Sequence, residues 1–517
     1  MQLFVEIRRN YYFDSIMTLI ASAELNSTDK VVAANVAMGT NQSKEYFTSM
    51  GLVSPEIDSA GENDLVIAAI TESDEHFKKL LDIVDGITNM DDLHCYNSTK
   101  YNDIRQAVAD NPSANLCSIA VPGEYALVEV KKALELGLHC VVFSNNVPMA
   151  DEREMKELAR QKGLLCMGPD CGVANINGAA LVLASINNRG PIGICGASGC
   201  GLQYVAAVLH EKGSGVTQVI GTGGMDIKED IGGISMLMGI DALEDDPATK
   251  YIVLISRKPA DLVLCRILGR VSSCKKPVIV FFMNANRAQV EASGAIWAEN
   301  LDDCAQKACG LIGAELSFPT DDEIYALALS ATNGMSREQK YVRGAFCGGT
   351  FCDEAMNALQ RKIGDIRSNC PTIPNLKLVD STVSVGNCVV DYGEEEFTLG
   401  RPHPVIDPSA RKPAILKEAG DPETAVLLLD IILAPPGHED PAGFIINDIK
   451  KAMEIVKSRG GRLAVVASVL GTDADFQNVQ VQKEQLEHAG VYVCMSNYRA
   501  ALLAGEIIRI KNEKDGH

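Results

Sequence analysis

The stretch RGPIGICGASGCGLQYVAAVLHEKG, residues 189–213, decides the fold of this chain. Its apolar first part predicts a strand, the glycine-rich segment Gly196–Gly201 predicts a tight turn, and the periodic apolar residues of 202–209 predict a helix. This order places unpaired backbone N–H groups and the positive end of the helix dipole at one point. Such a point binds phosphate or carboxylate. The same glycines could instead only shape a crossover in a doubly wound sheet.

Composition limits the classes of function. A chain of 517 residues is long enough for about three domains. The net charge of −21 argues against nucleic-acid binding, and the sequence lacks both a membrane-spanning apolar run and a signal peptide, so we expect a cytoplasmic protein that does not bind membranes. The 16 cysteines form no CxxC pair. They are interpreted as small hydrophobic residues, and no metal site is expected.

Strands and helices alternate through the first part of the chain. Residues 1–100 form a small α/β unit, with strands expected at 2–7, 30–37 and 64–71. The polar segment 89–111 is expected to be a connection. Residues 101–188 show a regular alternation of short apolar strands and helices, which predicts a parallel sheet. Ligands bind at the carboxyl ends of such strands. One cleft, similar to a CoA pocket, is therefore expected at the turns that contain Pro122, Asn145, Asn146, Gly168, Pro169 and Asp170.

The remaining sequence repeats one design. Residues 189–330 form the first copy and residues 341–517 the second, in which a strand at 342–346 leads into a second glycine turn and a helix. If the copies pack face to face, the two helix N-termini aim at one shared site. The residues expected to bind phosphate or substrate there are Gly196, Ala197, Ser198, Gly199, Cys200, Gly223, Gly224, Cys347, Gly348, Gly349 and Thr350.

These landmarks resemble the succinyl-CoA synthetase superfamily, in the turns Gly168–Cys171, Ser198–Cys200 and Cys347–Thr350. More closely, the chain is similar to the FdrA family. The stretches that carry this resemblance are the run GRPHPVIDP at 400–408, together with MGPDCG at 167–172 and MGT at 38–40. The resemblance implies an α/β fold with a Rossmann-like CoA-binding-type domain, two flavodoxin-like ligase domains and a small N-terminal unit.

The FdrA resemblance also implies a function. It suggests one subunit of an oxamate carbamoyltransferase of allantoin breakdown, active with partner subunits in an oligomer. This enzyme converts oxalurate and phosphate to oxamate and carbamoyl phosphate. CoA is the cofactor that the fold suggests. The alternative is an acyl-CoA synthetase-like protein that binds CoA, or a regulatory scaffold that has lost catalysis.

Two departures from the synthetases disfavour ATP-dependent ligation. Once the units are placed, no segment remains for an ATP-grasp domain, and the sequence has no phosphate-binding loop of the G-x-x-x-x-G-K-[ST] type. The phosphate-carrying histidine of the synthetases is also missing, because no histidine lies between His210 and His403. We therefore expect no ATP site.

Single residues leave alternatives open. His403, beside Arg401, is either a catalytic group or part of a rigid turn. Arg257, Arg287 or Arg401 could clamp an anionic transition state. Ser198 and Thr350 are expected to cap helices rather than act as nucleophiles, Cys200 is expected to pack, and Asp170 and Asp226 could face ligand or only form turns.

Overall fold

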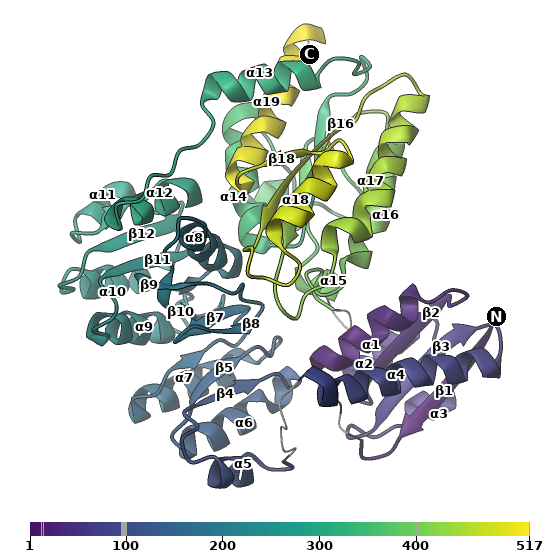
Figure 1. Ribbon diagram of the computed structural model, residues 1–517, viewed down its shortest axis with the longest axis vertical. Helices are drawn as coiled ribbons and strands as arrows, with labels where there is room; N and C mark the ends of the chain where they lie inside the picture. Colours follow the sequence, from purple (N-terminus) through teal and green to yellow (C-terminus); the bar gives the residue numbers. More distant parts are fainter. Residues whose placement is uncertain (12, 14, 95–100, 399–401, 516–517) are drawn as a thin grey trace.

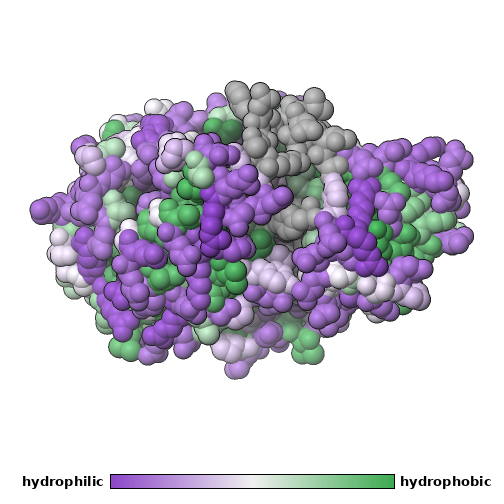
Figure 2. All heavy atoms as spheres, turned by 90° about the horizontal axis from the view of Figure 1, so that it is seen from below, coloured by the Kyte–Doolittle hydropathy of each residue, from purple (hydrophilic) through white to green (hydrophobic). Residues whose placement is uncertain are grey.

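The computed structural model describes residues 1–517 except 12, 14, 95–100, 399–401 and 516–517. Four α/β units follow one another along the chain, and the two C-terminal units lie against each other (Figure 1). Among the described residues, no helix is long and apolar enough to cross a membrane. Hydrophilic residues cover most of the face in Figure 2, with hydrophobic residues scattered between them.

The N-terminal unit is a three-stranded antiparallel sheet in the order β1-β3-β2, with helices and apolar side chains on both faces. The three predicted strands and their alternation with helices are confirmed. Helix α4 also continues into the segment expected to be a connection, since it ends at His94. The elements are β1 (Gln2–Arg8), α1 (Ser15–Ser27), β2 (Ala33–Met38), α2 (Asn41–Ser49), α3 (Pro55–Ser59), β3 (Leu65–Thr71) and α4 (Asp74–His94).

The second unit is a parallel sheet in the order β4-β5-β6. Its strands are short and apolar, and helices α6 and α7 start directly after Pro122 and Pro148, whose fixed backbone suits the residue before a helix. Helix α5 lies in the segment expected to be a polar connection. The elements are α5 (Ile104–Asp110), β4 (Leu116–Ile119), α6 (Gly123–Glu135), β5 (His139–Val142), α7 (Met149–Lys162) and β6 (Cys166–Met167).

The third unit is a seven-stranded sheet in the order β13-β12-β11-β9-β10-β7-β8. Residues 173–188 were assigned to the preceding unit without strands, but they form β7 and β8, and β7 pairs with β10, so this sheet begins at Val173 rather than at 189. The elements are β7 (Val173–Ile176), β8 (Ala179–Val182), β9 (Arg189–Ala197), α8 (Gly199–Glu211), β10 (Val216–Gly221), α9 (Ile234–Asp245), β11 (Tyr251–Arg257), α10 (Asp261–Val271), β12 (Val278–Met283), α11 (Arg287–Glu291), β13 (Ile296–Trp297), α12 (Leu301–Leu311) and α13 (Asp321–Ala331).

The fourth unit is a five-stranded parallel sheet in the order β15-β14-β16-β17-β18. Its elements are β14 (Tyr341–Phe346), α14 (Gly349–Ile363), the 3₁₀ turn η1 (Pro374–Leu376), β15 (Cys388–Asp391), α15 (Glu395–Thr398), η2 (Pro408–Ala410), α16 (Arg411–Gly420), β16 (Thr424–Ile432), α17 (Pro441–Ser458), β17 (Ala464–Leu470), α18 (Val479–His488), β18 (Tyr492–Cys494) and α19 (Asn497–Asp515).

The third and fourth units share one strand order. Five strands run β13-β12-β11-β9-β10 in one sheet and β18-β17-β16-β14-β15 in the other. The first parallel strand of each unit, β9 or β14, therefore lies second from one end of this common set and leads into a long helix, α8 or α14. The two units therefore share the strand order that a repeated design requires.

The two copies share a hydrophobic core. One cluster of buried residues runs from Ile192 and Val205 of the third unit to Phe351 and Val426 of the fourth. Helices α8 and α14 contact each other directly within it. Because burial of this apolar surface drives association, the two units form one continuous body, which we call the ligase-like pair.

Candidate functional site

The two helix N-termini meet at the centre of the ligase-like pair. Ser198 Oγ, at the start of α8, lies 2.9 Å from Thr350 Oγ1, at the start of α14, and both side chains are buried. The two glycine turns are therefore neighbours, as face-to-face packing of the copies requires. The helix cap expected at Thr350 was wrong, because α14 begins directly after Gly348 and has no side-chain cap hydrogen bond. We call the contact and the residues around it the junction.

The glycine turn before α8, which we call the first corner of the junction, begins later in the chain than the sequence suggested. The glycine turn before α14 is the second corner. Gly196 and Ala197 belong to strand β9, and a Cβ at Gly196 would lie 1.8 Å from the carbonyl oxygen of Ile255. Gly196 is thus required by close packing of strands rather than by a ligand. Ser198 caps α8 by accepting a hydrogen bond from the N–H of Gly201 at 3.2 Å, which is the capping role expected for it. Gly199 is partly exposed at the helix N-terminus.

The second corner is filled by a carboxylate. Asp430, from β16, accepts hydrogen bonds from the N–H groups of Cys347 at 2.8 Å and Gly348 at 2.9 Å. Arg411 Nη1 lies 3.1 Å from the same carboxylate, and both side chains are buried. These two N–H groups were expected to hold phosphate, but in this structure they hold Asp430. Asp430 therefore takes the place that the sequence assigned to an external anion.

Further acids surround the junction. Burial raises the pKa of Asp391 to about 8 and that of Asp353 to about 6, although Arg257 beside Asp353 opposes the second shift. Arg257 comes from the end of β11 and pairs with Asp353 through Nε. Its Nη2 atom would lie 3.6 Å from a Cβ at Gly349, so the guanidinium stands beside the N-terminus of α14. Buried carboxyls with raised pKa values, next to an arginine, are typical of sites that bind anions and move protons.

Cys200 is partly exposed and packs against the shared hydrophobic core. Burial raises the pKa of its thiol, and the neighbouring Asp430 and Asp391 act in the same direction. A thiol at a helix N-terminus normally has a lowered pKa, but here desolvation is the larger effect. Its sulfur would lie 2.6 Å from a Cβ at Gly348, which shows how closely the two corners pack.

His403 lies at the edge of the junction. Its Nε2 would be 2.8 Å from a Cβ at Gly393, and its Nδ1 accepts a hydrogen bond from Val405 N–H at 3.3 Å. Burial, with a contribution from Arg411, lowers the pKa of His403 to about 4, so the ring is neutral at physiological pH. The second expected catalytic residue, Arg401, lies outside the described residues. The catalytic role of both stays a prediction.

Two other predicted ligand-binding residues, Arg287 and Asp226, have structural partners of their own. Arg287 is exposed and pairs with Glu291 on its own short helix. Asp226 is a structural residue, because it accepts hydrogen bonds from the N–H groups of Ser235 and Met236 at 3.0 Å each and lies 3.0 Å from the buried Lys156. It caps the start of α9 instead of facing a ligand.

The turns of the second unit pack closely on one another. A Cβ at Gly123, directly after Pro122, would lie 2.4 Å from the carbonyl oxygen of Asn145 and 2.5 Å from that of Asn146. A Cβ at Gly168 would lie 2.2 Å from the carbonyl oxygen of Val142. The turns therefore share one sheet edge, as predicted.

The junction side of this edge includes a second turn. Gly223 has a φ of +82°, and a Cβ there would lie 2.1 Å from the carbonyl oxygen of Pro169, so the turn that contains Gly223 and Gly224 packs against the Gly168–Pro169 turn. Asp170 lies in the Gly168–Pro169 turn with an exposed side chain. Whether CoA or phosphate binds at these turns stays a prediction.

One cluster of side chains bears on metal binding. Among the described residues, Cys370, Asp391 and Glu394 bring three possible ligand atoms within 4.8 Å of one another, next to the junction. Acidic groups also gather this closely without an ion, so these three residues alone establish no metal site. The expectation of no metal site also stays a prediction.

Comparisons with known proteins follow this division of the chain. A family model described as CoA-ligase matches residues 345–507, and one described as AllF, heavy metal-associated domain, matches residues 1–94. The protein YahF of Escherichia coli (strain K12) is 40% identical over 507 residues, which is 98% of each chain. The chain belongs to the YahF family. Its fold is the mixed α/β fold of the CoA ligases, as the sequence predicted.

More distant relatives share only parts of the YahF-family chain. The alpha subunit of succinate–CoA ligase from Methanothermobacter thermautotrophicus is 28% identical over 191 residues, 36% of this chain and 62% of that subunit. The crystal structure of PH0766 from Pyrococcus horikoshii OT3 is 15% identical, with a TM-score of 0.33 over 81% of this chain and 88% of that one.

The N-terminal unit lacks the ligands that a heavy-metal site needs. Residues 1–94 contain no cysteine, and their histidines are His76 and His94. Soft heavy-metal ions select thiolate ligands, which this unit does not supply. The residues therefore do not fit a thiolate-bound heavy metal in the N-terminal unit.

Sequence reasoning missed several residues of the junction. Asp353 and Glu354 sit inside what looked like an ordinary amphipathic helix, and Asp430 sits in the middle of an apolar strand. The charged residue at an otherwise buried strand position was the one available signal for Asp430, because such a residue needs a partner.

Proposed function

We propose that this chain is a subunit of a carbamoyltransferase that moves a carbamoyl group between oxalurate and phosphate at the junction. The observation that carries the proposal is the 2.9 Å contact between Ser198 and Thr350, because it brings two helix N-termini, one from each half, to one point. Helix N-termini favour bound anions, and the junction adds an arginine and buried acids.

The reaction requires no covalent carrier on the protein. An oxygen of phosphate attacks the carbamoyl carbon of oxalurate and forms a C–O bond. The C–N bond to the oxamate nitrogen breaks, and that nitrogen takes up a proton. The products are carbamoyl phosphate and oxamate. The absence of a histidine between His210 and His403 in the sequence is consistent with this direct transfer.

The junction has residues that could bind phosphate, neutralise its charge and donate a proton to the leaving nitrogen. The partly exposed start of α8 at Gly199 offers backbone N–H groups to phosphate. Arg257 bonds Asp353 through Nε, and a guanidinium has five N–H donors, so its Nη donors remain for an anion. Asp391, whose pKa burial raises to about 8, is protonated at neutral pH and serves as the proton donor to the leaving nitrogen.

The resemblance to the FdrA family supports this choice of acyl group. The match of residues 1–94 to a model named for AllF is consistent with a role in allantoin breakdown. Asp430 occupies two N–H groups of the α14 corner, so phosphate is assigned to the α8 corner and Arg257.

A second candidate is a CoA-binding protein of the acyl-CoA synthetase type. The CoA-ligase match over residues 345–507 and the succinate–CoA ligase relatives favour it. In this case the chain keeps the ligase fold and handles an acyl-CoA, either with partner subunits or as a regulatory scaffold.

Calorimetry of the purified chain separates the two candidates. We expect phosphate, carbamoyl phosphate and oxamate to bind, and oxalurate to be cleaved in a phosphate-dependent reaction once partner subunits are added. CoA binding without binding of carbamoyl phosphate contradicts the carbamoyltransferase and supports the second candidate. Binding of ATP with formation of a phosphoprotein contradicts both and supports an ATP-dependent ligase.

A further inference from the structure

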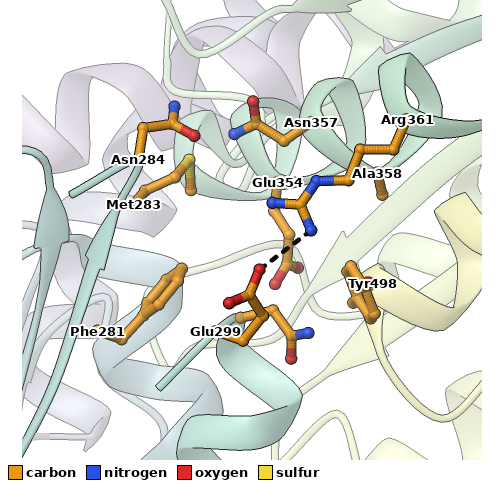
Figure 3. Close-up of a pocket in the computed structure, with 10 residues that line it drawn as sticks. Phe281, Met283, Asn284, Glu299, Glu354, Asn357, Ala358, Arg361 and Tyr498 are labelled. Carbon is orange, nitrogen blue, oxygen red and sulfur yellow. Dashed lines mark hydrogen bonds and ion pairs between the residues drawn. The ribbon is translucent and has the colours of Figure 1, made fainter. Parts of the chain in front are cut away.

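A small cavity that is partly open to solvent lies between the two halves of the ligase-like pair, further along α14 from Thr350. Phe281 and Met283 of β12 form one wall, and Tyr498 of α19 lies on the opposite side (Figure 3). Met283 pairs in register with Arg257, so the cavity opens beside the carboxyl edge of the sheet where ligands of α/β proteins bind. Neither the sequence motifs nor the proposed function uses it.

One wall of the cavity carries a hydrogen-bond donor without a partner. Asn357 Nδ2 is buried and has no acceptor within the described part of the chain. In Figure 3 the carboxamides of Asn357 and Asn284 lie at the same end of the cavity. An unsatisfied buried donor is destabilising. A ligand with a carbonyl oxygen at this end would remove that cost.

The charges of the lining cancel. Arg361 reaches across the cavity to Glu299, with Nη1 to Oε1 at 3.3 Å (Figure 3). Glu354 accepts hydrogen bonds from Leu301 N–H at 3.2 Å and Asn497 Nδ2 at 2.9 Å. Burial and the nearby Asp302 raise the pKa of Glu354 to about 8, so this side chain is uncharged at neutral pH. The lining thus has polar donors and acceptors but no net charge.

We propose that this cavity binds a small uncharged ligand with a primary amide or urea group. The ligand carbonyl accepts a hydrogen bond from Asn357 Nδ2, and its apolar part packs against Phe281 and Met283. An ionised ligand is disfavoured, because the single cation of the lining, Arg361, is already paired with Glu299. Binding at the cavity does not depend on the proposed function, since it requires neither phosphate nor a partner subunit.

Acetamide and acetate test the preference for an uncharged amide on the unaltered chain. The protein is labelled with ¹³C at its methionine methyl groups, and the Met283 signal is assigned with Met283→Leu. Acetamide at pH 7 is expected to shift the Met283 methyl signal and to bind about tenfold more tightly than acetate, which corresponds to about 1.4 kcal/mol. Equal or tighter binding of acetate, or no shift of the Met283 signal, overturns the proposal.

A matched pair of variants tests the assigned donor. Asn357→Leu removes the donor at nearly constant size, and acetamide binding is expected to weaken about tenfold. Gln360→Leu, on the same helix, is the control. Gln360 Nε2 is also buried and has no partner among the described residues, but its side chain does not line the cavity. This variant is expected to bind acetamide as the unaltered chain does. Equal losses in both variants overturn the assignment of Asn357.

The result of the acetamide experiment and the result of the oxalurate assay are independent of each other. Acetamide binding at Met283 with no cleavage of oxalurate leaves the cavity site intact and removes the carbamoyltransferase. Oxalurate cleavage with no acetamide binding does the reverse.

Discussion

The hydroxyl groups of Ser198 and Thr350 lie 2.9 Å apart, although 152 residues separate them in the chain. Each belongs to the first turn of a helix that follows the first strand of its copy. Ser198 also caps its own helix through the N–H of Gly201. A duplicated strand, turn and helix have thus produced one junction to which both copies contribute the same kind of residue.

Each single variant at Ser198 or Thr350 is expected to lose the unfolding free energy that their contact contributes, so this loss is counted twice when the two single effects are added. Ser198→Ala removes a helix cap and an inter-half hydrogen bond, at a cost of about 1–2 kcal/mol of unfolding free energy, and Thr350→Val removes the hydrogen bond at about 1 kcal/mol. The double variant should lose about 1 kcal/mol less than the sum. Urea unfolding measures each value.

Thr320→Ala is the matched control for that cycle. Thr320 caps α13 through Glu323 N–H in an exposed capping box, away from the junction. The unfolding free energy lost in Thr320→Ala should add fully to that lost in Ser198→Ala. Full additivity of the Ser198 and Thr350 variants would show that their contact contributes nothing to stability.

Glu354 predicts a specific dependence of stability on pH. Burial and Asp302 raise its pKa from 4.5 to about 8 in the folded chain. Between these values the folded state keeps a proton that the unfolded state releases, so this residue makes the protein less stable as pH rises, and its effect levels off above about 8. The slope is at most about 1.4 kcal/mol per pH unit.

Glu354→Gln removes that titrating group at nearly constant shape. Relative to the unaltered chain, the variant should become progressively more stable as pH rises from about 5 to about 8, with no further gain above. Urea unfolding at several pH values gives the difference, in which other titrating groups cancel. Parallel stability curves for the two proteins would mean that Glu354 is ionised in the folded state.

Much of the fold follows from local sequence patterns. The strand, turn and helix at 189–213 and its repeat at 342–363 each combine an apolar run, glycines and a helical period. Since parallel sheets require crossovers, these patterns restrict the topology. The capping roles of Ser198 and Thr320 are equally local, although only that of Ser198 was predicted. The pairing of β7 with β10 depends on contacts distant in sequence, and it was not predicted.

The chemistry of the junction depends on distant contacts even more strongly. Asp430 bonds Cys347 and Gly348 across 83 and 82 residues, so no local pattern shows that the second glycine turn already holds a carboxylate. Glu354 and Asn357 lie on α14 at positions that only packing against the other half buries. Their environment, and therefore the raised pKa of Glu354, requires the three-dimensional structure.

Arg257 is expected to matter for anion binding. Arg257→Gln removes the cation beside the start of α14, and phosphate should bind at least about tenfold more weakly, because charge-assisted hydrogen bonds contribute about 1.5–3 kcal/mol. Lys258→Gln is the control, since Lys258 pairs with the exposed Asp261 one turn away. Calorimetry with phosphate compares the two. Equal phosphate affinity in both variants would place the anion elsewhere.

Asp430 is expected to be a large contributor to stability. Asp430→Asn keeps the shape of the side chain but leaves the guanidinium of Arg411, whose side chain is 2% exposed, without its carboxylate. A buried charge that loses its partner costs about 3–5 kcal/mol, which thermal unfolding would show as a markedly lower Tm. Asp261→Asn, in an exposed ion pair, should change stability by less than about 0.5 kcal/mol.

A second substitution distinguishes the lost charge pair from lost hydrogen bonds. Adding Arg411→Met to Asp430→Asn removes the unpaired cation, and uncharged replacements of a buried ion pair are often well tolerated. The double variant should therefore recover much of the lost Tm. If it is as unstable as Asp430→Asn alone, the stabilisation by Asp430 comes instead from its hydrogen bonds to the N–H groups of Cys347 and Gly348, which hold the second corner in place.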